Sequence, residues 1–124
     1  MNIIDSSLWI DYFNGKLKDN SVIGTVEDSA SQCVPSICLY EVYKKILTDK
    51  GESTARGYAS FMQNATVISI TPQIAIQAAR LGKELKLPMA DSIIYATAQI
   101  HNAELYTQDK HFDGLANVHY FEKP

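Results

Sequence analysis

The sequence of 124 residues contains only two cysteines, Cys33 and Cys38. They have neither the CxxC spacing nor the nearby histidine that a zinc site needs. A chain of this length can also bury a core without cross-links. We therefore expect reduced thiols that pack as small hydrophobic side chains.

Long hydrophobic runs are missing as well. The apolar stretches are too short to span a bilayer. Residues 1–7 lack the basic and apolar segments of a secretory signal peptide. We expect a cytoplasmic protein that has no membrane-spanning segment.

Basic residues are not in excess, since the formal net charge is −3. This charge argues against a broad basic surface that grips nucleic acid. An acidic protein can instead bind divalent cations, which then contact phosphates. The placement of the acidic residues has to decide between these two possibilities.

The chain has no internal repeat, low-complexity segment or linker, which predicts a single domain over residues 1–124. Short apolar or β-branched runs predict strands at 2–4, 32–35, 67–70, 104–107 and 118–121. Helical patterns fall at 7–13, 20–29, 36–49, 52–63, 72–85 and 90–102, with Ser36 as the N-cap of the third helix. Strands that alternate with helices predict an α/β sandwich, in which helices cover both faces of a mostly parallel sheet.

Three aspartates fall where ligands gather in such folds, at the carboxyl ends of the strands. Asp5 directly follows the first strand, and Asp109 comes two residues after strand 104–107. Asp91 lies in the first turn of the helix that leads into strand 104–107, so this helix must begin at the same edge.

A fourth acid, Glu41, lies about 7–8 Å along the helix that begins at Ser36, at ~1.5 Å per residue. Its side chain can still reach the edge. Four crowded carboxylates raise one another's proton affinity unless a cation neutralises them. Oxygen ligands without histidine or cysteine favour magnesium, manganese or calcium over zinc. A bound metal of this kind can activate water and stabilise the leaving oxygen of a phosphodiester.

Each acid also has a structural interpretation. Asp5 can cap the helix after it, Asp91 can interact with the helix dipole, and Asp109 can form an Asx-turn. Glu41 can pair with Lys45, one helical turn further on. Only the arrival of all four acids at one edge favours the functional interpretation.

Neighbouring polar residues have weaker claims. Asp113 is a candidate accessory acid, although a surface turn explains it equally well. For His111 we weigh an RNA contact against a structural or solvent role and favour the latter. The basic residues Arg80, Lys83 and Lys86 lie on one helix, where a solvated polar face is the default.

The pattern of motifs resembles PIN domains. Residues 3–9 (IIDSSLW) are similar to the opening strand, aspartate and helix of that family, and Glu41-Val42-Tyr43 resembles its mid-helix acid. Residues 87–98 (LPMADSIIYATA) and 107–112 (TQDKHF) resemble its later motifs. In length and spacing the chain is similar to the toxin component of VapBC-type toxin–antitoxin pairs.

The resemblance implies a PIN-like three-layer α/β/α sandwich and a magnesium- or manganese-dependent endoribonuclease. Asp5, Glu41, Asp91 and Asp109 match the acidic quartet of the family, and Thr107 matches a hydroxyl position beside it. The resemblance further implies an RNA substrate, a homodimer and a cognate antitoxin that keeps the enzyme inactive.

Other function classes fit less well. A phospho-acceptor receiver domain needs an aspartate after its third strand, where this chain has Thr71-Pro72. A haloacid-dehalogenase-type phosphatase needs a second aspartate two residues after the first, and here that residue is Ser7. The remaining alternative is a PIN-like module that binds RNA or a protein without cleaving RNA.

Overall fold

A parallel sheet of five strands forms the centre of the computed structural model, which describes residues 1–123. The strands are β1 (Asn2–Ile4), β2 (Cys33–Pro35), β3 (Thr66–Ile68), β4 (Glu104–Thr107) and β5 (Val118–Tyr120). β4 pairs with both β1 and β5, and β2 pairs with β3. A parallel bridge between Asn2 and Gln32 joins the two groups, so the strand order is β3-β2-β1-β4-β5.

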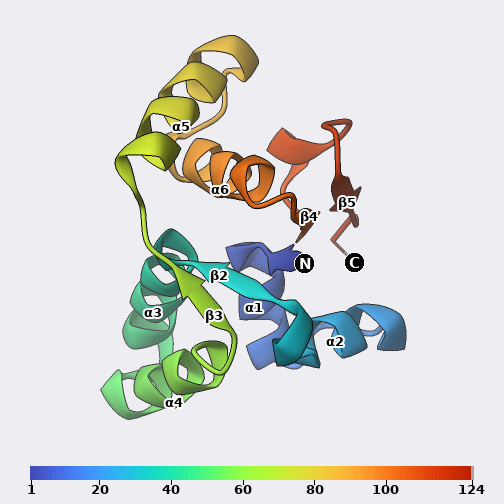
Figure 1. The fold of residues 1–124 in the computed structure, drawn as a ribbon. Helices are drawn as coiled ribbons and strands as arrows, with labels where there is room; N and C mark the ends of the chain where they lie inside the picture. The colour runs from blue at the N-terminus through green and yellow to red at the C-terminus, as the bar shows by residue number, and fades with distance from the viewer. Residues whose placement is uncertain (124) are drawn as a thin grey trace.

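Helices cover the strands on both sides. They are α1 (Ser6–Phe13), α2 (Asn20–Glu27), α3 (Ser36–Lys50), α4 (Glu52–Met62), α5 (Pro72–Leu85) and α6 (Met89–Ile100). In Figure 1, α5 and α6 lie above the strands, while α1, α2 and α4 lie below them. The predicted α/β/α sandwich with a parallel sheet is therefore confirmed.

Local capping signals fix several helix ends. The Thr71 hydroxyl accepts a hydrogen bond from the Ile74 amide at 3.2 Å, and Pro72 occupies the first turn of α5. Proline is favoured there because its missing N–H would have no partner within the helix. Asp19 caps α2 by accepting a bond of 2.8 Å from the Ser21 amide.

Two details of the prediction are wrong. Ser36 is the first residue of α3 and not its N-cap. Pro35 takes the N-cap position, and no side chain of the described residues caps this end. The third strand is Thr66–Ile68 and not 67–70, because its partner β2 is only three residues long. Pro35 pairs with Ile68 at the end of the ladder, and the chain then turns into α3.

Aromatic side chains hold α1 against α4. Trp9 is 1% exposed and stacks on Phe13, whose ring lies 4.1 Å from that of Tyr58 and parallel to it. Phe61 packs edge-on against both Trp9 and Phe13. Trp9 is buried and the other three rings are partly buried, and their packing contributes apolar area that stabilises this side of the sheet.

Two smaller expectations can be compared with the structure. Cys33 and Cys38 are free and buried, as predicted. Within residues 1–123, no helix is long and apolar enough to cross a membrane.

Candidate active site

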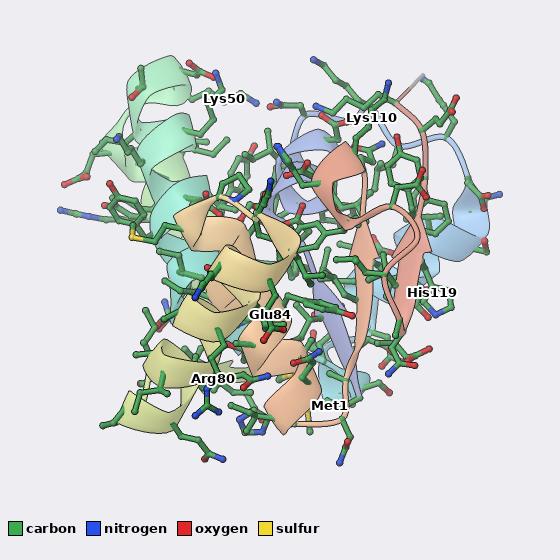
Figure 2. The ribbon with its side chains drawn as sticks, turned by 90° about the horizontal axis from the view of Figure 1, so that it is seen from above. Met1, Lys50, Arg80, Glu84, Lys110 and His119 are labelled. Carbon is green, nitrogen blue, oxygen red and sulfur yellow. The ribbon has the colours of Figure 1, made fainter. Side chains whose placement is uncertain are left out.

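The four predicted acids meet at the carboxyl edge of the sheet. Asp5 follows β1, and Asp109 follows β4 and precedes a short 3-10 helix, η2 (Lys110–Phe112). In Figure 2 this edge lies at the top of the view: Lys110, next to Asp109, lies at the opposite end of the molecule from Met1, which precedes β1. The parallel strands thus deliver side chains from distant parts of the sequence to one end of the sheet.

Asp5 is the most buried of the four, at 3% exposure. It occupies the N-cap position of α1, but its side chain makes no capping bond. Its carboxylate instead accepts hydrogen bonds from Ser7 Oγ at 2.9 Å and Thr107 Oγ1 at 2.7 Å. Burial raises the pKa of Asp5, and these two hydroxyls partly offset the rise. The capping interpretation of Asp5 is therefore wrong.

Glu41 reaches the edge from the second turn of α3. Its carboxylate accepts a hydrogen bond of 2.7 Å from Ser6 Oγ. Lys45 pairs with Asp49 at 3.3 Å, so the predicted Glu41–Lys45 ion pair is wrong. Burial raises the pKa of Glu41, and the nearby charges of Asp5 and Asp109 add to the rise.

Asp91 lies in the first turn of α6, as predicted, and is 8% exposed. Burial raises its pKa to about 8, and the charge and hydrogen bond of Asp109 contribute next. The charges of Asp5 and Glu41 also raise it. Near neutral pH this carboxyl group therefore keeps a proton unless a cation takes the proton's place.

Asp109 combines a structural role with its place in the cluster. Its Oδ1 caps η2 by accepting the His111 amide at 2.9 Å, so the predicted turn role is present. Its own amide donates to Thr107 Oγ1 at 2.9 Å. Burial raises the pKa of Asp109, but hydrogen bonds from the His111 amide, from Asp91 and from the His111 ring outweigh burial and leave the pKa lowered.

His111, for which the sequence favoured a structural or solvent role, lies in the acidic cluster. Its Nδ1 lies 2.7 Å from Asp109 Oδ1 and 3.3 Å from Asp91 Oδ2. One ligand atom from each of these three residues lies within 4.8 Å of the others. The only sequence signal for this placement is that His111 follows Asp109 by two residues, because the short helix η2 was not predicted.

The two accessory candidates differ. Thr107 is fully buried and links Asp5 to Asp109 through its hydroxyl group. Asp113 is exposed at the end of η2 and lies outside the group formed by Asp91, Asp109 and His111. The structure therefore joins Thr107 to the site and leaves Asp113 at its margin.

The donor atoms fit a hard divalent cation. Four carboxylates from four separate segments supply oxygen atoms, which magnesium and manganese prefer. Burial, and after it the charge and hydrogen bond of Asp109, raise the pKa of Asp91, so a cation that replaced the proton would relieve both effects. Among the described residues, Asp91, Asp109 and His111 bring their ligand atoms within 4.8 Å of one another, and the charges of Asp5 and Glu41 act on Asp91.

Two connected cavities open next to the acids. The larger has a volume of about 600 Å³ and shares Ser7 and Asp109 with the site. The smaller, of about 320 Å³, adjoins it through Gln108 and Glu122. Four basic side chains line the two cavities: Lys16, Lys18, Lys110 and Lys123. Asp19, Asp109 and Glu122 line the same cavities, so basic and acidic side chains alternate beside the cluster.

A protein-family model, described as the PIN domain, matches residues 3–118. The chain belongs to the PIN domain family. No match to a curated protein was found.

Solved structures share the whole architecture of this PIN domain. A toxin–antitoxin complex from Klebsiella pneumoniae aligns with a TM-score of 0.81 and 27% identity, covering 98% of this chain and 99% of that one. DNA-bound VapBC from Salmonella typhimurium gives 0.77 and 17% identity over 100% of both chains. A sarcin–ricin-loop-cleaving VapC toxin from Mycobacterium tuberculosis gives 0.78 and 15% identity, again over 100% of both. At 17% and 15% identity the last two establish the shared fold alone.

Proposed function

We propose that this PIN domain is a divalent-metal-dependent endoribonuclease that acts as the toxin of a type II toxin–antitoxin pair. The observation that carries the proposal is the meeting of Asp5, Glu41, Asp91 and Asp109 at one sheet edge, with the pKa of Asp91 raised to about 8. Such crowding destabilises a protein unless a cation relieves it, so it points to a function that uses the cation.

Asp5, Asp91 and Asp109 would hold the ion, while Glu41 would bind a second ion or position the attacking water. When bound, a divalent cation supplies an activated water and stabilises the leaving oxygen. Ser7 and Thr107 hold the Asp5 carboxylate in place through their hydroxyl groups. Rigid placement of this kind keeps the ligand atoms ready before substrate binds.

The cavities beside the acids support an RNA substrate. The larger cavity can hold a nucleotide next to Asp109, with Tyr120 in its wall and Lys110 and Lys123 available for phosphates. Lys16 and Lys18 continue this basic lining in the smaller cavity. A single strand that follows these lysines would pass the acidic cluster at one phosphodiester.

The proposed partners follow from the structural neighbours. The Klebsiella complex pairs a toxin with an antitoxin, and its similarity to this chain supports a cognate antitoxin here. We also propose a homodimer. Apolar side chains are exposed on α3 and α5, and an antitoxin or a second copy of the chain would bury them: Tyr40, Leu47, Ile76 and Leu85. The free thiols of Cys33 and Cys38 fit the cytoplasm as the compartment.

Cleavage of a mixed RNA pool tests the proposal. Purified wild type, Asp91→Asn and the control Asp49→Asn are incubated with magnesium, manganese or EDTA. Among residues 1–123, Asp49 pairs with Lys45 alone, on the exposed face of α3, so its substitution leaves the cluster intact. We expect Asp91→Asn to lower cleavage by at least on the order of 100-fold, as for other groups that stabilise a charged transition state.

Three results would contradict the proposal. Cleavage that persists in EDTA would show that the activity does not need a metal. Equal cleavage by wild type and Asp91→Asn would show that the active site is not at Asp91. A folded wild type that neither cleaves RNA nor binds manganese at millimolar concentration would favour the noncatalytic binding module.

A further inference from the structure

We infer that the imidazole of His111 is itself a ligand of the cation, which makes this site favour transition-metal ions over magnesium. The inference rests on the proposed function, because it needs a divalent cation among the acids. It adds a nitrogen donor to a site that the four carboxylates would make purely oxygen-based.

The distances on this side of the cluster suit a shared ion. Adjacent ligands of an octahedral ion with bonds of about 2.1 Å lie about 3 Å apart. His111 Nδ1 lies 2.7 Å from Asp109 Oδ1 and 3.3 Å from Asp91 Oδ2, so both distances are close to the distance expected between adjacent ligands. One cation can therefore contact all three side chains after small adjustments.

The backbone fixes His111 in this place. Its amide donates a hydrogen bond to Asp109 Oδ1. The same oxygen also contacts Nδ1 of the His111 ring, so one carboxylate holds both the backbone and the side chain of His111. The next residue, Phe112, is completely buried and pins η2 to the core. The backbone of His111 is thus fixed, while its side chain is 56% exposed and is oriented by the contacts of Nδ1 with Asp109 and Asp91.

The nature of the donor sets the selectivity. Magnesium prefers oxygen ligands and gives up bound water reluctantly. First-row transition ions accept imidazole nitrogen, and their affinities for mixed nitrogen and oxygen sites rise from manganese towards copper. Loss of His111 should therefore weaken manganese binding more than magnesium binding.

Manganese bound to the intact protein provides a direct test that does not depend on cleavage. Wild type is compared with His111→Asn and with the matched control His119→Asn. His119 lies on β5 and bonds to Glu104 at 3.0 Å, which keeps it out of the acidic cluster. Pulsed electron paramagnetic resonance detects a nitrogen nucleus bonded to Mn²⁺, and calorimetry gives the dissociation constants. Circular dichroism confirms that each variant is folded.

We expect nitrogen coupling in wild type and in His119→Asn, and its loss in His111→Asn. The Mn²⁺ dissociation constant should rise on the order of tenfold in His111→Asn, the scale seen for residues around metal sites. The Mg²⁺ constant should change by about threefold or less, because magnesium gains little from nitrogen.

The opposite results separate this inference from the proposed function. Tight manganese binding without nitrogen coupling in wild type would overturn the role of His111 while the ribonuclease proposal stands. Nitrogen coupling to Mn²⁺ that persists in His111→Asn would also overturn the role of His111 as a ligand. Absence of manganese binding in every folded protein would overturn both.

Discussion

Two regions that meet at α1 follow opposite physical rules. The aromatic cluster of Trp9, Phe13, Tyr58 and Phe61 buries apolar area, and its rings stack closely. The acidic cluster at the N-terminal end of the same helix buries carboxylates that repel one another, beginning with Asp5. The first region stabilises the fold, and the second costs stability that a proton on Asp91 or a bound cation restores. The contrast shows how a small domain tolerates a destabilising acidic site: a well-packed aromatic core lies next to the site and offsets its cost in stability.

The largest effect on stability should come from breaking the aromatic side of this comparison. Trp9→Ala removes the most central ring and is expected to lower the free energy of unfolding by about 3–5 kcal/mol. Among residues 1–123, the buried Nε1 of Trp9 has no hydrogen-bond partner, so Trp9→Phe should cost clearly less. Urea denaturation of the two variants measures the difference. An equal loss in both would show that ring packing is not what Trp9 contributes.

The acidic cluster should make the stability of the metal-free protein depend on pH. The folded pKa of Asp91 is about 8 against an ordinary value of 3.8, so between these values the folded state binds more protons than the unfolded state. Stability is therefore greatest below about pH 4 for this group and is lost as the pH rises towards 8. We expect the melting temperature in EDTA to fall on the order of 10 °C from pH 5 to pH 8.

The same experiment has two internal controls. Manganese should reverse the loss at pH 8, because the ion replaces the proton on the acids. Asp91→Asn should flatten the pH dependence and be more stable than wild type at pH 8 without metal. A melting temperature that rises with pH in EDTA would contradict the crowding argument.

Thr107 tests the connection that holds the acids in place. Thr107→Val removes the hydroxyl that donates to Asp5 and accepts from the Asp109 amide, and should cost about 1–3 kcal/mol. Thr107→Ser keeps both bonds and should recover most of the loss. Chemical denaturation and manganese affinity report on fold and site separately. Equal behaviour of the two variants would mean that the methyl group, and not the hydroxyl, is what matters.

The smallest effect should come from the lysines of the cavity. In an Asp91→Asn background, which prevents cleavage, Lys110→Gln with Lys123→Gln should weaken binding of single-stranded RNA. The slope of log affinity against log salt should fall by about 1.4, or about 0.7 for each lost phosphate contact. The control pair on α5, Arg80→Gln with Lys83→Gln, should leave the slope unchanged. Equal changes in both pairs would mean that charge anywhere on the surface is sufficient.

Local rules explain which parts of this fold were predictable. Thr71-Pro72 and the Pro88 break define α5 and α6 because capping and proline geometry act within a few residues. The third strand was placed too late because its length depends on β2, which lies about thirty residues earlier in the chain. Ser36 looked like an N-cap by residue type, yet the backbone turn falls at Pro35.

The sequence by itself determined the alternation of strands and helices, the edge at which the acids gather, and the family, since each depends on order and spacing along the chain. Only the tertiary structure decided the strand order and the partners of each acid. It joined Glu41 to Ser6 and not to Lys45, and it turned His111 onto Asp109 and Asp91. Most of these contacts link residues far apart in the sequence, and they form because parallel strands bring their carboxyl ends together.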